Sequence, residues 1–453
     1  MRLFLRIVAG LVLLGLLVVV ALILWPLRLT APERLTVADD AMAWPAVEKE
    51  DYPRLAVVAA DCAACHTADD GARFAGGRAF PTPMGTIYSS NITPDDETGI
   101  GGYTLDEFRA ALVDGVRGDG AHLYPAMPYT NYRKLAERDV AAIYDYMMNQ
   151  VEPVRNTPPE DEMTFPFNLR FGIRAWKWVS LPRPGFTAAS DDPVLARGAY
   201  LVEGPEHCGA CHSPRNALFV QSGYDASDPD FLSGGELNGW PVPSLRGEDG
   251  APATWSEQAL TDYLRTGRNA ASGVGGEMTL VVEHSLQELP DSDVAAIVAY
   301  LRALAPNGGG SDDGLLVTAD GTRAGALRDA QDSTGTIAML SAADPDEMEL
   351  GARLYLDNCS GCHFSDGDGS DSVVPRLDGN RIVNADSPVG LIKTILDGAE
   401  LPSTHLAPYA LAMPGFADRL DDAEVAELAS FVRRAWSNDA PPVEADAIGQ
   451  YRE

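Results

Sequence analysis

The sequence predicts a mostly helical chain in which three similar domains follow an N-terminal membrane-spanning helix. Three observations lead to this prediction: a length of 453 residues, a five-residue motif that occurs three times, and one long apolar run near the N-terminus. At roughly 150 residues per domain, the length suits about three domains. No convincing series of alternating strands accompanies the helical patterns. We expect domains at 45–150, 191–305 and 341–438, linkers at 151–190 and 306–340, and a tail at 439–453.

Residues 1–30 carry the membrane signal. Arg2 and Arg6 precede an uncharged apolar run from Ile7 to Trp25, which at about 1.5 Å per residue is long enough to cross a bilayer core. The run exceeds the roughly 7–15 apolar residues of a secretory signal peptide, and no clear cleavage site follows it. We therefore expect an uncleaved anchor with its N-terminus in the cytoplasm and the remaining chain in a periplasm-like space.

The chain is strongly acidic, with a formal net charge of −32. This charge argues against a nucleic-acid partner, because a phosphate backbone would be repelled. Two interpretations stay open: the charge keeps the protein soluble, or it attracts a basic soluble carrier.

The repeated motif has the form Cys-x-x-Cys-His. Its three copies are Cys62-Ala-Ala-Cys65-His66, Cys208-Gly-Ala-Cys211-His212 and Cys359-Ser-Gly-Cys362-His363. These copies use all six cysteines of the chain, so no thiol is left for a disulfide framework or a free nucleophile.

The repeat extends well beyond the motif. Each copy is followed by a helical pattern that ends at a glycine, over 104–115, 254–267 and 387–398. Capping boxes are expected at Thr104 with Glu107 and at Thr254 with Glu257, and Ser387 precedes a proline at the first helical position. A methionine follows each glycine, and a last amphipathic helix begins near Asp139, Asp293 and Ala423. A short helix also runs into each motif.

Cys-x-x-Cys-His is the attachment signature of c-type haem. The two thiols can add to the porphyrin vinyl groups while the adjacent histidine presents its imidazole to the iron. The methionines Met127, Met278 and Met413 are the candidate sixth ligands, and this pairing suits electron transfer because it leaves no open iron site. The alternative for a methionine is a place in the core, and Met278 lacks the following proline of the other two. His122, His207, His284 and His405 could in principle replace a methionine, but we expect them at the surface or on the propionate side of a haem.

Two other interpretations of the cysteines are weaker. A structural zinc site needs four ligands, commonly from two Cys-x-x-Cys knuckles, and three identical units would pair awkwardly. A thioredoxin-like dithiol needs a strand–helix context that the sequence lacks.

Residues 165–179 mix Phe171, Trp176 and Trp178 with Arg170, Arg174 and Lys177. We expect an amphipathic helix that braces the first two domains. The alternative is a segment at the bilayer interface or against a partner.

Taken together, these residues resemble the triheme cytochrome c subunit of membrane-bound periplasmic dehydrogenases of the alcohol, gluconate, sorbitol and fructose types. The resemblance covers residues from about 50 to 438 and is most specific at "NITPDDETGIGGYTLDEF", "HLYPAMPY", "RGAYLVEGPEHCGACHSPRN" and "CSGCHFSDGDG". It implies three covalently bound haems with His66, His212 and His363 as proximal ligands and Met127, Met278 and Met413 as distal ligands.

The resemblance also implies partners and a location. A large dehydrogenase subunit carrying flavin or pyrroloquinoline quinone would oxidise the substrate, with a small subunit as an optional further partner. This chain would pass the electrons to ubiquinone from the periplasmic side of a bacterial inner membrane, and would not be an enzyme by itself. A cytochrome donor of a terminal oxidase or other respiratory complex is the alternative. An independent peroxidase-like enzyme is a third, which three distal methionines disfavour.

Overall fold

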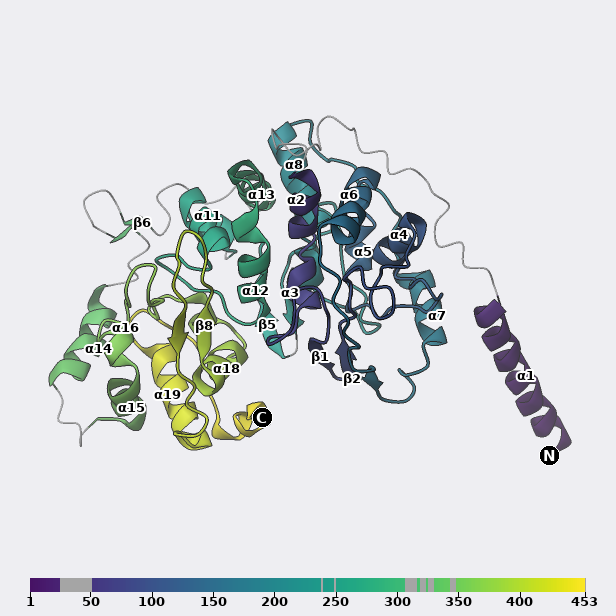
Figure 1. Cartoon of the computed structure of the whole chain (residues 1–453). Coiled ribbons are helices and arrows are strands. Elements are labelled where there is room, and N and C mark those ends of the chain that lie inside the picture. The colour runs from purple at the N-terminus through teal and green to yellow at the C-terminus, as the bar shows by residue number, and fades with distance from the viewer. Residues whose placement is uncertain are drawn as a thin grey trace. The chain divides into compact units, whose positions relative to one another are not determined.

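The computed structural model describes residues 1–24, 51–237, 239–247, 250–305, 316–317, 323–324, 330–342 and 348–452 (Figure 1). Residues 25–30 of the expected anchor, 45–50 of the first expected domain and most of the expected linker 306–340 lie outside this set. The chain divides into two compact units. The first comprises Met1–Ala189, Tyr200–Ala210 and Arg215–Asp225, and the second comprises Ser190–Ala199, Cys211–Pro214 and Ala226–Glu453.

Helix α1 (Arg2–Leu24) occupies the described part of the expected anchor. Among the described residues it is the one helix that is long and apolar enough to cross a membrane, judged by length and composition. Large apolar side chains such as Leu11 and Leu17 are exposed along it.

In the first unit after α1, helix α2 (Tyr52–Ala59) packs against helix α6 (Glu137–Asn149) (Figure 1). Its elements are α2 (Tyr52–Ala59), α3 (Cys62–His66), β1 (Ala79–Thr82), β2 (Gly85–Tyr88), α4 (Leu105–Asp114), α5 (Tyr129–Tyr132), α6 (Glu137–Asn149), β3 (Glu162–Met163) and α7 (Phe171–Ser180). Val57 of α2, Leu112 of α4 and Ile143 of α6 meet in one buried core. The expected linker 151–190 contributes structure to this unit, because β3 pairs with β2 and α7 follows.

Residues 193–304 follow the same plan. The elements are α8 (Pro193–Glu203), α9 (Gly209–His212), β4 (Gly235–Leu237), β5 (Trp240–Val242), α10 (Ala251–Thr254), α11 (Glu257–Thr266), α12 (Glu277–His284), the 3₁₀ helix η1 (Leu286–Glu288) and α13 (Asp291–Leu304). Helices α8 and α13 cross at Gly198, where an added Cβ would lie 2.0 Å from the Ala296 carbonyl oxygen. Arg197 and Asp293 form a buried ion pair beside this crossing, with a distance of 2.8 Å between Nε and Oδ1.

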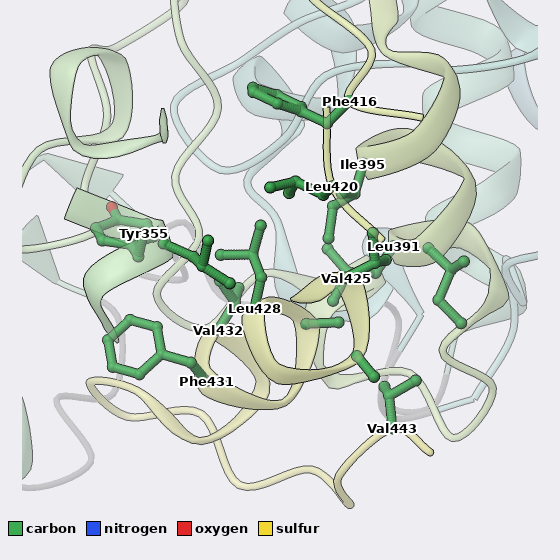
Figure 2. Packing of buried hydrophobic residues seen from close by; sticks show 14 of the residues in the cluster. Tyr355, Leu391, Ile395, Phe416, Leu420, Val425, Leu428, Phe431, Val432 and Val443 are labelled. Atoms are coloured by element: carbon green, nitrogen blue, oxygen red, sulfur yellow. The ribbon is translucent and has the colours of Figure 1, made fainter. Parts of the chain in front are cut away.

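The described residues from 316 onward repeat the plan once more. The elements are β6 (Leu316–Val317), β7 (Arg323–Ala324), α14 (Ala330–Ala342), α15 (Leu350–Asn358), α16 (Ser360–His363), α17 (Arg381–Asn384), α18 (Val389–Asp397), β8 (Ala399–Leu401), β9 (Leu411–Met413), α19 (Asp422–Arg434) and the 3₁₀ helices η4 (Ala445–Ala447) and η5 (Gly449–Tyr451). Side chains of α15, α18 and α19 point into one core (Figure 2). Helix α14, which begins inside the expected linker, adds Leu340 to this core, and the C-terminal tail adds Val443 and Ile448.

Within the second unit, the β8–β9 hairpin is held by a residue from the preceding repeat. Arg268 is 2% exposed and donates hydrogen bonds to the carbonyl oxygens of Pro402 (2.6 Å) and Tyr409 (3.1 Å). Its guanidinium also lies over the Tyr409 ring, 5.1 Å from the ring centroid. The loop between the two strands is therefore fixed at its base by a buried cation.

The expected helix ends are confirmed at the C-termini and in part at the N-termini. Gly115, Gly267 and Gly398 follow α4, α11 and α18 with φ angles of 62°, 73° and 82°. The capping box of Thr104 with Glu107 is present.

Two expected caps are wrong. Thr254 ends the short helix α10, so α11 begins only at Glu257 and its N-cap is Ser256, whose hydroxyl accepts from the Ala259 N–H. In α18 the N-cap is Pro388 rather than Ser387, and no side chain caps it.

The described chain is mostly helical, as expected, but short antiparallel hairpins accompany the helices. Strands β4, β5, β8 and β9 contain three residues each. Such segments are too short to show the alternation by which a strand is recognised in a sequence.

Candidate functional site

Each Cys-x-x-Cys-His copy lies on a short helical turn that ends at its histidine, namely α3, α9 and α16. The residue before the first cysteine is left-handed in two copies, with φ angles of 47° at Asp61 and 39° at His207. This sharp entry begins a new helical turn, so the two cysteines and the histidine of a copy stand at i, i+3 and i+4, on neighbouring positions of one helix face.

Each histidine of the three copies is oriented in the same way. The Nδ1 atom of His66 lies 2.7 Å from the Ser90 carbonyl oxygen, that of His212 lies 2.8 Å from Pro243, and that of His363 lies 2.9 Å from Pro375. Because a carbonyl oxygen only accepts, Nδ1 carries the proton and Nε2 keeps its lone pair. This is the arrangement by which proteins fix an imidazole for a metal.

The surroundings of the three imidazoles favour their neutral form. Burial lowers the pKa of His66, His212 and His363, and the hydrogen bond to the backbone carbonyl acts in the opposite direction. A neutral imidazole is the form that can donate a lone pair to iron.

A second pair of hydrogen bonds repeats around each histidine. In each copy, the backbone N–H of a glycine donates to the carbonyl oxygen of the motif histidine. A second backbone hydrogen bond has as its acceptor the residue two positions before that glycine. Its donor is the residue two positions after the one whose carbonyl accepts from the histidine Nδ1. The first bond joins Gly76 to His66, Gly234 to His212 and Gly369 to His363, and the second joins Ile92 to Phe74, Leu245 to Leu232 and Leu377 to Gly367. The three glycines and the three second acceptors all have positive φ, so the same loop geometry occurs three times.

The close contact between two backbone segments explains why residue 76 is a glycine. A Cβ added to Gly76 would lie 2.4 Å from the carbonyl carbon of Ser90, the residue that accepts from His66. Any larger residue there would push the acceptor away from the imidazole.

The three expected methionines lie in different local structures. Met127 is in the loop between α4 and α5 and packs, with Cys62, against the core of the first unit. Met413 ends β9 and packs, with Cys359, against the core shown in Figure 2. Met278 is the second residue of α12. In the first and third repeats, therefore, the methionine and the first cysteine border the same apolar cluster.

Comparison with known proteins identifies the family. Residues 195–305 and 348–436 match the family model "Cytochrome c". The chain is 39% identical over 386 residues to the alcohol dehydrogenase (quinone) cytochrome c subunit of Gluconobacter oxydans strain 621H, covering 84% of this chain and 77% of the relative. It is 39% identical over 431 residues to the gluconate 2-dehydrogenase cytochrome c subunit of Pantoea cypripedii (93% and 91%). It is 37% identical over 410 residues to the fructose dehydrogenase cytochrome subunit of Gluconobacter japonicus (87% and 81%).

This chain belongs to the family of cytochrome c subunits of dehydrogenase complexes. Such a subunit carries covalently bound haem c and transfers electrons, while a separate dehydrogenase subunit performs the catalysis. A dehydrogenase partner is therefore implied for this cytochrome c subunit too.

The pKa values of two motif cysteines are strongly raised. Burial raises the pKa of the Cys62 thiol to about 12, with a further contribution from the neighbouring Asp61 carboxylate, and burial raises the pKa of Cys359 to about 12. Over the described ranges, no three or more His, Cys, Asp and Glu side chains are grouped as they would be around a metal ion.

All four histidines considered as alternative iron ligands have protein interactions in the structure. His122 Nδ1 lies 3.1 Å from Lys177 Nζ, His405 Nε2 lies 2.6 Å from a Glu288 carboxylate oxygen, and the His207 ring lies 5.5 Å from the Tyr132 ring. His284 ends α12.

Sequence reasoning missed the residues that support the motifs. Arg78 donates to the Ala64 carbonyl at 2.7 Å, and Arg215 donates to the Ala210 carbonyl at 2.7 Å, so two copies are braced at the same motif position. One signal could have located two of the histidine acceptors: Pro243 and Pro375 both open the pattern Pro-x-Leu-x-Gly after their motif.

Helix α7 covers most of the aromatic and basic segment at 165–179. Lys177 on this helix is buried and donates to the carbonyl oxygens of Asp114 (2.7 Å) and Gly115 (2.6 Å). Trp178 and Val179 remain 49% and 69% exposed. The helix is thus held to its unit by a lysine while apolar side chains face outward.

Proposed function

We propose that this cytochrome c subunit holds three haems, one in each repeat. Thioether bonds would form at Cys62 and Cys65, at Cys208 and Cys211, and at Cys359 and Cys362; the iron ligands would be His66 with Met127, His212 with Met278, and His363 with Met413. The observation that carries this proposal is the set of hydrogen bonds around each motif histidine, which occurs three times with the same pattern. The corresponding domains would cover 45–150, 191–305 and 341–438.

The proposed path of electrons begins at a large dehydrogenase subunit with flavin or pyrroloquinoline quinone and ends at ubiquinone in the membrane. The relatives named for alcohol (quinone), gluconate and fructose dehydrogenases support such a partner. The apolar helix α1 supports an anchor, with the haem domains on the periplasmic side of a bacterial inner membrane. A small third subunit would complete the assembly.

The residues of the chain set the conditions for this transfer. When bound, haem supplies a one-electron iron couple whose potential depends on the axial ligands. Each backbone carbonyl holds its imidazole in the tautomer that leaves Nε2 available. Cys62 with Met127 and Cys359 with Met413 are partly buried and pack against apolar clusters, and methionine ligation would close the sixth position to substrates.

A pyridine haemochrome spectrum combined with intact-mass spectrometry of the purified full-length chain tests the haem count. We expect three thioether-linked haems per chain. The paired variant Cys208→Ser with Cys211→Ser should retain two, and a third haem that persisted in this variant would contradict the assignment.

Isolation of the complex from membranes tests the partners. We expect a flavoprotein or quinoprotein dehydrogenase subunit to copurify, and its substrate to reduce all three haems in a stopped-flow experiment. Copurification with an oxidase core instead would support the alternative function.

A further inference from the structure

The segment 268–273 of the second repeat, which follows α11 and Gly267, contacts the third repeat. This segment and the whole third repeat belong to the second compact unit. In the first and third repeats, the residue after the helix-ending glycine is Val116 or Ala399, whereas in the second repeat it is Arg268. A position that is apolar in two repeats therefore carries a long cation in one, and that cation reaches into another repeat.

Arg268 fixes the hairpin that carries Met413. It donates hydrogen bonds to the carbonyl oxygens of Pro402, which follows β8, and of Tyr409, which lies just before β9. Arg268 thus reaches both ends of the loop that connects the two strands. Met413 is the last residue of β9 and pairs with Ala399 at the start of β8. Because the loop is tied at both ends, the hairpin and its methionine are held in one position.

The other end of the segment packs against the backbone group that orients His363. Gly273 lies against Pro375, whose carbonyl oxygen is 2.9 Å from His363 Nδ1. A Cβ added to Gly273 would lie 3.1 Å from Pro375 Cγ and 2.6 Å from a methyl carbon of Leu401, the last residue of β8. A side chain at this position would have to displace one of these two residues, so the glycine allows Pro375 to keep its place.

Asn380 adds hydrogen bonds that join the same two places. Its side chain is 7% exposed. Its Nδ2 atom donates to the carbonyl oxygen of Ala271 in the second repeat (3.2 Å) and to that of Arg376 in the third (2.9 Å). Arg376 directly follows Pro375. The backbone beside the acceptor of His363 is therefore bound to the second repeat by a buried amide as well as by packing.

The supports of both expected ligands of the third haem thus depend on the second repeat. The hydrogen bond at Nδ1 raises the basicity of a metal-bound imidazole, and a methionine on the opposite side of the iron raises the reduction potential. Disturbing the two supports should therefore have opposite effects. A weaker bond at Nδ1 makes the imidazole a poorer electron donor and raises the potential, whereas a methionine that is held less firmly lowers it.

We propose that the segment 268–273 of the second repeat positions the ligands of the third haem and so sets its reduction potential. Arg268 holds the hairpin of Met413, and Gly273 lets the Pro375 carbonyl stay against His363. Arg268 and Gly273 are positioning residues, because they act through these ligands. The inference rests on the proposed function and assigns to one repeat the control of the potential in another.

Redox titration of the purified full-length chain, followed by visible spectroscopy, tests the proposal. Met413→Leu is measured first, because the component that it shifts to lower potential belongs to the third haem. We expect Arg268→Met to lower the potential of the same component and to let it bind carbon monoxide in the reduced state. Carbon monoxide binding separates a displaced methionine from the mere loss of a positive charge. Arg265→Met is the matched control, since Arg265 of α11 donates to the Leu289 carbonyl of its own repeat.

Gly273→Ala tests the support of His363 with a smaller change, and it keeps the proposal testable if Arg268→Met does not fold. We expect the third-haem component to move to higher potential while carbon monoxide binding stays absent. Gly275→Ala is the matched control, because a Cβ at Gly275 would meet no atom within 4 Å and neither glycine has a left-handed φ. This control should leave the third-haem component in place.

The sign of the two shifts decides the outcome. An unchanged third-haem component in Arg268→Met or in Gly273→Ala would overturn the proposal. Shifts of the same sign in both variants would also overturn it, because a general loss of stability would explain them. If Met413→Leu itself moved no component of the titration, the ligand assignment of the proposed function would fail, which is a different result from the failure of this inference.

Discussion

The Nδ1 atom of His66 lies 2.7 Å from the carbonyl oxygen of Ser90, and Gly76 packs directly against that carbonyl group. We predict that Gly76→Ala displaces the carbonyl, frees the imidazole and changes the reduction potential of one haem, because partners of metal-bound histidines orient the ring and set its basicity. Redox titration followed by visible spectroscopy would resolve this haem from the others.

Gly120→Ala is the matched control for this variant. Gly120 also has positive φ, at 85°, but a Cβ there would meet no atom within 4 Å. Both variants carry backbone strain, so an equal change in potential for both would contradict the role given to the Ser90 carbonyl.

Met127→Leu tests the first candidate distal ligand. Loss of a methionine ligand should lower the potential of that haem and open its sixth position, so one haem per chain should bind carbon monoxide in the reduced state. Met148→Leu is the control, because Met148 packs against the same core without an expected ligand role. Carbon monoxide binding that stayed absent in Met127→Leu would exclude Met127 as a ligand.

Asp293→Asn tests the ion pair at the α8–α13 crossing. Arg197 would be left as a buried charge without its counter-ion, and breaking such a pair costs about 3–5 kcal/mol in the free energy of unfolding. The comparison is Asp291→Asn, because Asp291 also pairs with an arginine, Arg265, but its side chain is 91% exposed. That change should cost less than about 1 kcal/mol. If the two variants had equal urea midpoints, burial would not be what makes the Arg197–Asp293 pair important for stability.

Lys177 should make the stability of the protein depend on pH. Burial and the Arg133 cation lower its pKa from 10.5 to about 7, although the Asp114 carboxylate acts in the opposite direction. Between these values the unfolded chain binds more protons than the folded chain, so the free energy of unfolding should rise as the pH increases from about 7 to about 10.5.

Lys177→Met should flatten this rise, as measured by urea unfolding at a series of pH values. His122 titrates in a separate window, because burial and the cations of Lys177 and Arg174 lower its pKa to about 4. Lys393→Met controls for the loss of a lysine elsewhere. If the slope above pH 7 were the same in Lys177→Met as in the unmodified protein, the assignment would be wrong.

The helices were the most predictable part of this chain. Apolar residues at intervals of three and four predicted α6, α13 and α19, and a glycine with positive φ ends each helix before the methionine, because few other residues adopt that conformation. The motifs were visible for a similar reason, since covalent haem attachment demands fixed residue types at fixed spacing.

Other parts of the site carry no such signal. The acceptors of the histidine Nδ1 protons are backbone carbonyls, which every residue has, and Ser90 has no sequence pattern in common with Pro243 and Pro375. The strand that ends at Met413 has three residues. The sequence predicted Lys177 as part of an amphipathic helix but gave no sign that its ammonium group is buried, where the carbonyl oxygens of Asp114 and Gly115 accept its hydrogen bonds. These features depend on tertiary contacts.

Arg268 donates hydrogen bonds to the carbonyl oxygens of Pro402 and Tyr409, so the last two repeats are not structurally independent of each other. A polypeptide shortened to end at residue 305 would retain this arginine without its acceptors. The C-terminal portion by itself would lose the hydrogen bonds from Arg268 that hold the hairpin ending at Met413. A truncated variant should therefore contain both of these repeats. A destabilising substitution in one repeat is expected to change the visible spectrum of the haem in the other.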